Sequence, residues 1–166
     1  MKESILLFVL LISCAMISSC NVIVESEAEE GKLDIEILHE GNILTTTDFS
    51  VFPNNKTRKQ SLVFRSQEDY DDTLLDYTDE DSEILDFSEG RVLLVDMGPR
   101  GSGGYSTKIS SVSEHNNYVL VNVVFYKPGT NCLASMATTN PFKFVWIPST
   151  KEILVRETLE IKDCSE

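Results

Sequence analysis

The first candidate for a functional segment is a glycine-rich stretch, GPRGSGGYSTKI, from Gly98 to Ile109. Four glycines and a proline fall within seven residues. Such a loop can bind a phosphate, form a tight turn or bring bare backbone against another protein. A phosphate loop needs a lysine and a serine or threonine after its last glycine, at the start of a helix. Here Tyr105 and a strand-like segment follow Gly104, so phosphate or dinucleotide binding is not expected.

Other catalytic or metal-binding constellations are missing from the sequence. The two histidines, His39 and His115, belong to no hydrolase motif. The acidic run from Asp79 to Glu83 has neither the glycine nor the glutamate that a calcium loop of the EF-hand type requires. A catalytic role for Cys132 needs a base that folding brings to it, and pairing of this cysteine in a disulfide would abolish its reactivity. We therefore expect no enzyme, no metal site and no cofactor.

The N-terminus reads as a secretory signal. Lys2 is followed by an unbroken apolar run over residues 5–12, which is too short to span a bilayer as a helix. The last four residues of the segment 1–20, Ile-Ser-Ser-Cys, resemble the bacterial lipobox, in which the cysteine receives a lipid and becomes the mature N-terminus. That resemblance implies lipidation of Cys20 and a lipid anchor at the bacterial outer membrane, on its periplasmic or surface face. The alternative is an ordinary signal peptide with a coincidental cysteine.

The charge of the chain restricts its partners. The formal net charge is −13 at pH 7, which repels nucleic acid and anionic lipid surfaces. Attachment to a membrane would therefore come from the lipid alone. Residues 21–32 are rich in glutamate with little to bury, which predicts a flexible acidic tether.

Two cysteines, Cys132 and Cys164, remain once Cys14 and Cys20 are assigned to the signal and to the lipid. Two cysteines in an exported protein most simply pair with each other. A loop of this length would stabilise the fold by about 3–4 kcal/mol. Two separate thiols are the alternative.

The pattern of apolar residues predicts a mainly β fold of the α+β class. Residues 33–38 alternate apolar and acidic side chains, strand-like pieces lie around Ile43 and Val51, and residues 61–65 form a better strand. A helix is predicted over residues 67–77, with Ser66 as its N-cap. Five further strand-like segments follow from residue 91, separated by turn and loop residues; they cover 91–97, 105–112, 118–126, 142–147 and 152–161. Short links between successive strands predict an antiparallel meander or a sandwich, with one helix.

Four motifs occur in order between residues 86 and 148. They are Asp-Phe-Ser at 86–88, the glycine loop with its Gly-Gly-Tyr end, the Pro-Gly turn at 128–129 and Thr-Asn-Pro-Phe at 139–142 with Ile-Pro after it. Together they resemble the C-terminal domain of the protease complex subunit PrcB family. One departure is Ser102, where the family usually has threonine. Residues 86–166 are thus expected to form the PrcB-like β domain, with residues 33–85 supplying further strands and the helix of the same domain.

The resemblance implies a non-enzymatic exported lipoprotein that supports a surface peptidase complex. It directs attention to two loops, Gly98 to Tyr105 and Lys127 to Pro141. The candidate interaction residues in them are Gly98, Gly103, Gly104, Tyr105, Asn140 and Pro141. For the Gly-Gly-Tyr end, a binding role and a purely structural turn are both open. In the second loop, Leu133, Met136 and Ala137 either tuck under the sheet or join a contact surface.

Two functions from different classes follow from these features. The first is an accessory or protein-binding subunit whose partner is a peptidase or another envelope protein. The second is a small-ligand-binding or purely structural lipoprotein of the cell envelope.

Overall fold

The computed structural model describes residues 31–42 and 58–164. The signal segment 1–20 with Cys20, the tether up to residue 30 and the strand-like pieces around Ile43 and Val51 lie outside the described residues. The described elements are β1 (Gly31–Lys32), β2 (Glu36–Asn42), β3 (Gln60–Phe64), α1 (Gln67–Leu74), β4 (Arg91–Asp96), β5 (Ser106–Glu114), β6 (Tyr118–Pro128), β7 (Pro141–Ile147) and β8 (Glu152–Lys162).

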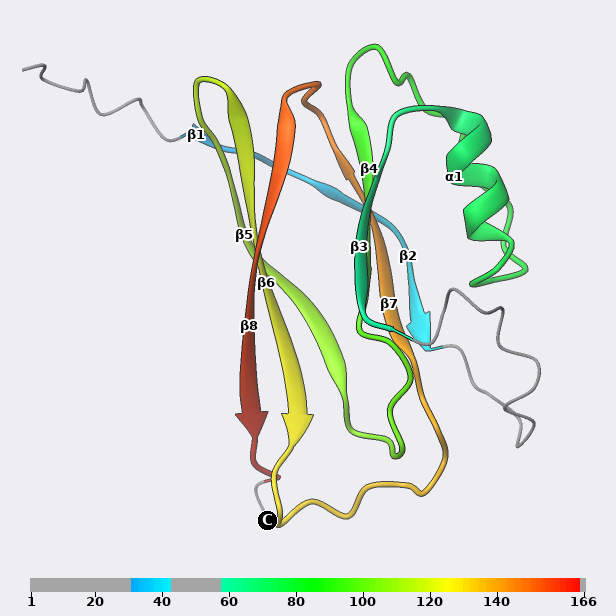
Figure 1. The fold of residues 1–166 in the computed structure, drawn as a ribbon, viewed down its shortest axis with the longest axis vertical. Helices are drawn as coiled ribbons and strands as arrows, with labels where there is room; N and C mark the ends of the chain where they lie inside the picture. Colours follow the sequence, from blue (N-terminus) through cyan, green and yellow to red (C-terminus); the bar gives the residue numbers. More distant parts are fainter. Residues whose placement is uncertain (1–30, 43–57, 165–166) are drawn as a thin grey trace, which may run out of the picture.

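The strands form two four-stranded sheets that face each other as a sandwich (Figure 1). The first sheet has the order β1-β5-β6-β8 and the second has the order β2-β7-β4-β3. All neighbouring pairs are antiparallel except β6 and β8, which are parallel. The predicted mainly β fold with one helix is confirmed, and of its two forms the sandwich is the one found.

The parallel pair arises because the chain changes sheet three times after β4. The loop after β4 leads from the second sheet to β5 in the first, and the loop after β6 leads back to β7 in the second. When β8 returns to the first sheet, it runs in the same direction as β6 and pairs with it along its whole length. A simple meander would have kept consecutive strands adjacent.

The N-terminal part of the fold differs from its prediction. Gly31 and Lys32, the last two residues of the expected tether, pair with β5 as a short strand. Residues 33–35 then cross from the first sheet to the second, where β2 begins at Glu36. The alternation over 33–38 is therefore not one strand: Leu33 and Ile35 pack against the core during the crossing, and β2 extends instead to Asn42.

The core lies between the sheets, and a second apolar cluster lies under the helix. The first cluster is formed by inward-facing side chains of β4, β5, β6 and β7. The second cluster packs Tyr70, Leu74 and Tyr77 against Phe144 and its neighbours. It lies where α1 covers the outer face of the second sheet (Figure 1).

The helix starts as predicted and stops earlier than predicted. Ser66 caps it by accepting a hydrogen bond from the Asp69 amide at 3.2 Å. The helix ends at Leu74, and residues 75–77 form a turn. This turn directs the Tyr77 side chain inward, where its hydroxyl donates a hydrogen bond to Asp96.

Candidate functional site

Two loops lie together at one end of the sandwich, at the bottom of Figure 1. Residues 98–105 lie in the connection between β4 and β5, and residues 129–140 connect β6 to β7. Both loops pass from one sheet to the other. We refer to these two loops together as the platform.

Hydrogen bonds hold the two loops of the platform to each other. Arg100 and Thr139 form an isolated antiparallel bridge, with N···O distances of 2.7 and 3.0 Å. The Gly103 amide donates to the Ser135 carbonyl at 2.9 Å. The Thr139 hydroxyl donates to the Ser102 carbonyl at 3.0 Å. The loops therefore form one unit, because their backbones satisfy each other's hydrogen bonds.

The second loop is also tied to the end of β8. A disulfide joins Cys132 to Cys164, across a sequence separation of 32 residues. The Gly129 amide donates to the Lys162 carbonyl at 3.0 Å, and the Asn131 side-chain amide donates to the Cys164 carbonyl at 3.1 Å. The second loop is therefore held both by the first loop and by the end of β8, so the platform can present a preformed surface.

Two glycines of the first loop adopt backbone conformations that other residues rarely adopt. Gly98 and Gly104 have φ angles of +74° and +84°, a region that side chains with a Cβ rarely occupy. A Cβ at Gly98 would lie 2.7 Å from the Lys59 amide nitrogen, and one at Gly104 would lie 3.1 Å from the Pro128 Cβ. The loop connects two sheets. If the Gly-Gly-Tyr end has a purely structural role, it therefore builds a corner between the sheets and not a hairpin.

Burial separates the predicted interaction residues into two groups. Gly98, Gly103, Asn140 and Pro141 are buried, with Asn140 0% exposed. These four residues cannot offer contact surface, because the packing of the two loops and β7 covers them. Gly104 is exposed and Tyr105 is half-buried, so both can contact a partner.

The exposed apolar part of the platform comes from the second loop. Leu133 and Met136 are 105% and 96% exposed, and Ala137 is also exposed. Of the two alternatives for these side chains, the structure shows that they do not tuck under the sheet. Gly101, which sequence reasoning did not single out, lies exposed in the first loop with open space around it.

A buried network of hydrogen bonds joins the first residue of the platform, Gly98, to Asp96, Tyr77 and Gln60. Asp96 is 0% exposed, accepts a hydrogen bond from the Tyr77 hydroxyl at 2.6 Å and accepts another from the Gly98 amide at 2.7 Å. Gln60 donates to the Tyr77 hydroxyl at 3.0 Å. Burial raises the pKa of Asp96, and burial likewise raises the pKa of Tyr77. Sequence reasoning missed this network, although a lone carboxylate after the apolar run VLLV was a signal for it.

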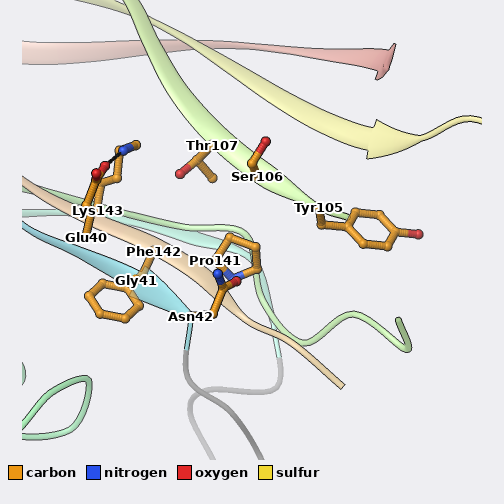
Figure 2. A pocket seen from close by; sticks show the side chains of 9 residues that line it. All are labelled: Glu40, Gly41, Asn42, Tyr105, Ser106, Thr107, Pro141, Phe142 and Lys143. Carbon is orange, nitrogen blue, oxygen red and sulfur yellow. Dashed lines mark ion pairs between the residues drawn. The ribbon is translucent and has the colours of Figure 1, made fainter. Parts of the chain in front are cut away.

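A separate groove lies between the sheets, beside Tyr105 (Figure 2). It has a volume of about 250 Å³ and runs between β2 and β7 on one side and the start of β5 on the other. Lys143 and Glu40 form an ion pair there. Burial lowers the pKa of Lys143. The groove is also lined by the hydroxyl side chains of Ser106 and Thr107.

The histidines lie apart from the platform. The His39 Nδ1 atom lies 2.7 Å from Glu80, and its ring packs near Tyr70 and Phe144. His115 stacks on Tyr118 with ring centroids 4.4 Å apart. The His115 Nε2 atom lies 3.2 Å from the Ser113 Oγ atom of β5.

No group of three or more His, Cys, Asp or Glu side chains in the described part of the chain could hold a metal ion. No helix within the described ranges is long and apolar enough to cross a membrane.

The comparison with known families supports the resemblance seen in the sequence. Residues 91–148 match the family described as PrcB C-terminal. The matched segment holds β4, β5, β6 and β7, which are the two inner strands of each sheet. The edge strands β1, β2, β3 and β8 come from outside the match. No curated protein and no solved structure matches the chain significantly.

Proposed function

We propose that this protein is a non-catalytic, exported lipoprotein that serves as an accessory subunit of a peptidase complex in the bacterial cell envelope. Its lipid would be carried by Cys20, and the outer membrane is its proposed location. The match of residues 91–148 to the PrcB C-terminal family supports association with a protease complex. The platform supplies the surface for that association.

The observation that carries the proposal is the combination of rigidity and apolar exposure at the platform. Leu133 and Met136 are almost fully exposed on a loop that a disulfide and backbone hydrogen bonds hold in place. A restrained loop loses little conformational entropy on binding, and exposed apolar side chains gain free energy when a partner covers them. Rigid loops on a β scaffold are common contact surfaces.

The direction of the chain fits this role. Gly31, where the described chain begins, pairs with Glu114 at the end of β5 that lies far from the platform (Figure 1). A tether that leads from a lipid on Cys20 to Gly31 would enter at the end opposite the platform. The platform would then face away from the membrane, toward a partner.

Co-purification from native membranes tests the proposal. The complete chain, with an epitope tag at its C-terminus, is captured from detergent-solubilised membranes of its own organism, and the retained proteins are identified by mass spectrometry. We expect a peptidase or a subunit of its complex to be retained. The double variant Leu133→Glu/Met136→Glu should lose it, because two carboxylates would have to be desolvated in the interface.

The matched control is Ile84→Glu. Ile84 is 95% exposed and lies between α1 and β4, outside both loops. Its replacement should leave capture unchanged, and all three proteins should share one melting temperature. If no peptidase component is retained by the natural chain, or if the double variant retains it equally well, the accessory-subunit proposal is wrong.

A further inference from the structure

A second hollow lies directly beside the platform, in the open end of the sandwich. It has a volume of about 340 Å³, at the lower end of the range for ligand sites. Strands β6 and β8 of the first sheet contribute to it, as do the first loop of the platform and the residues next to β3 and β4. Its lining residues are Lys59, Met97, Arg100, Tyr105, Phe125, Lys127 and Leu159.

The charge of the hollow is opposite to the charge of the chain. Three of its lining residues are cationic, in a protein with 14 Lys and Arg against 27 Asp and Glu. Lys59 forms an ion pair with Glu157, so its charge is compensated. No carboxylate among the described residues lies within ion-pair distance of Arg100 or Lys127.

Arg100 also holds a polar atom without a partner. Its guanidinium donates to the Met97 carbonyl, whereas its Nε atom is buried with no hydrogen-bond acceptor among the described residues. Lys127 is half-buried at the end of β6. Cations that are partly removed from water without a counterion favour the binding of an anion.

The rest of the lining is apolar and aromatic. Lys59 lies over the Phe125 ring at 5.1 Å, and Arg100 lies over the Tyr105 ring at 5.8 Å. Met97 is buried at the base, and Leu159 contributes an exposed apolar side chain from β8. A ligand for this hollow therefore needs an anionic group and an apolar body of about the size of one side chain.

We propose that the hollow binds a carboxylate attached to an apolar or aromatic group, with the terminal residue of a polypeptide chain as the ligand. Arg100 and Lys127 would contact the carboxylate, and Phe125, Tyr105 and Leu159 would contact the side chain. This inference deepens the proposed function. It rests on the proposed function for the protein that supplies the carboxylate, because the chain terminus would belong to the partner bound at the platform. The chemistry of the hollow itself can be tested without that partner.

Isothermal titration calorimetry on the full-length protein in detergent provides the test. The probes are N-acetyl-L-phenylalanine, which has a free carboxylate, and its uncharged amide, which controls for the apolar part and for partition into detergent. We expect the carboxylate to bind at least about tenfold more tightly than the amide, as hydrogen bonds to charged groups allow. Its affinity should fall as the salt concentration rises.

Two charge-removing variants localise the effect. Lys127→Gln should bring the affinity for the carboxylate close to that for the amide. Lys108→Gln, which removes an exposed lysine of β5 outside the hollow, should change nothing. Arg100→Gln should resemble Lys127→Gln, and its melting temperature shows whether the platform has survived the loss of the Met97 contact.

Three results would overturn the inference: no binding of either probe, equal binding of both, or a Lys127→Gln variant as tight as the natural chain. A tripeptide that ends in phenylalanine, compared with its C-terminal amide, identifies the source. If only the free acetyl amino acid binds, the ligand is a small carboxylic acid and the assignment to a chain terminus is wrong. Failure of the platform proposal would show separately, because Leu133→Glu/Met136→Glu should still bind N-acetyl-L-phenylalanine.

Discussion

Reduction of the Cys132–Cys164 disulfide should destabilise the protein by a predictable amount. The two cysteines are 32 residues apart. In the loop-entropy description, a crosslink of that span lowers the entropy of the unfolded chain enough to stabilise the fold by about 4 kcal/mol. For a protein of this size, such a loss corresponds to a fall of about 8–15 °C in melting temperature.

Urea unfolding with and without reductant measures this difference. Trp146, the only tryptophan, lies on β7 of the second sheet and packs edge-on against Phe87, whereas Cys164 follows β8 of the first sheet, so its fluorescence follows global unfolding. The matched control is the double variant Cys132→Ser/Cys164→Ser, which should have the stability of the reduced protein and should not respond to reductant. A difference below about 1 kcal/mol between the oxidised and reduced proteins would refute the entropic reasoning. A double variant that still responds would show that another cysteine causes the effect.

Three further predictions concern glycines and one buried acid. Gly90→Ala should cost about 1–3 kcal/mol of unfolding free energy, because a Cβ there would lie 2.6 Å from the Ile147 carbonyl oxygen; Gly101→Ala, in open space, should cost far less in the same urea titration. Gly104→Arg should lower the melting temperature through its positive φ, whereas Gly101→Arg should not; equal melting temperatures would show that the backbone at residue 104 relaxes freely. Burial raises the pKa of Asp96, so the folded protein keeps this proton to a higher pH than the unfolded chain, and the contribution of Asp96 to stability falls as pH rises through that raised pKa. The stability of Asp96→Asn relative to the natural chain should therefore improve as pH increases from 4 to 7, and a pH-independent difference in urea unfolding would contradict this.

Much of the secondary structure could be predicted from the sequence because its causes are local. The strands from β3 onward lie within two residues of their predicted bounds at every end. Alternating apolar side chains and Gly, Pro and Asn turns act over a few residues, so they can be read from a short window. The start of α1 was predictable for the same reason, because Ser66 caps it through a contact three residues away.

The candidate site was predictable only in part. The sequence located both loops of the platform, and the family match covers the inner strands that carry them. It could not show that Asn140 and Pro141 are buried, because the first loop and β7 cover them only after folding. The turn-like composition of a segment predicts that the segment is a loop. It does not predict which residues of the loop are exposed to solvent.

The sequence by itself determined where strands, turns and the helix cap form, and it determined the strongly acidic charge of the chain. Only the tertiary structure decided which sheet each strand joins, that β6 and β8 run parallel, and that Lys59, Lys127 and Leu159 line one hollow. The physical reason is the separation along the chain of the residues that interact. Periodicity and turn chemistry depend on neighbouring residues, whereas the choice of strand partner and the lining of a hollow depend on packing between segments that lie far apart in the chain.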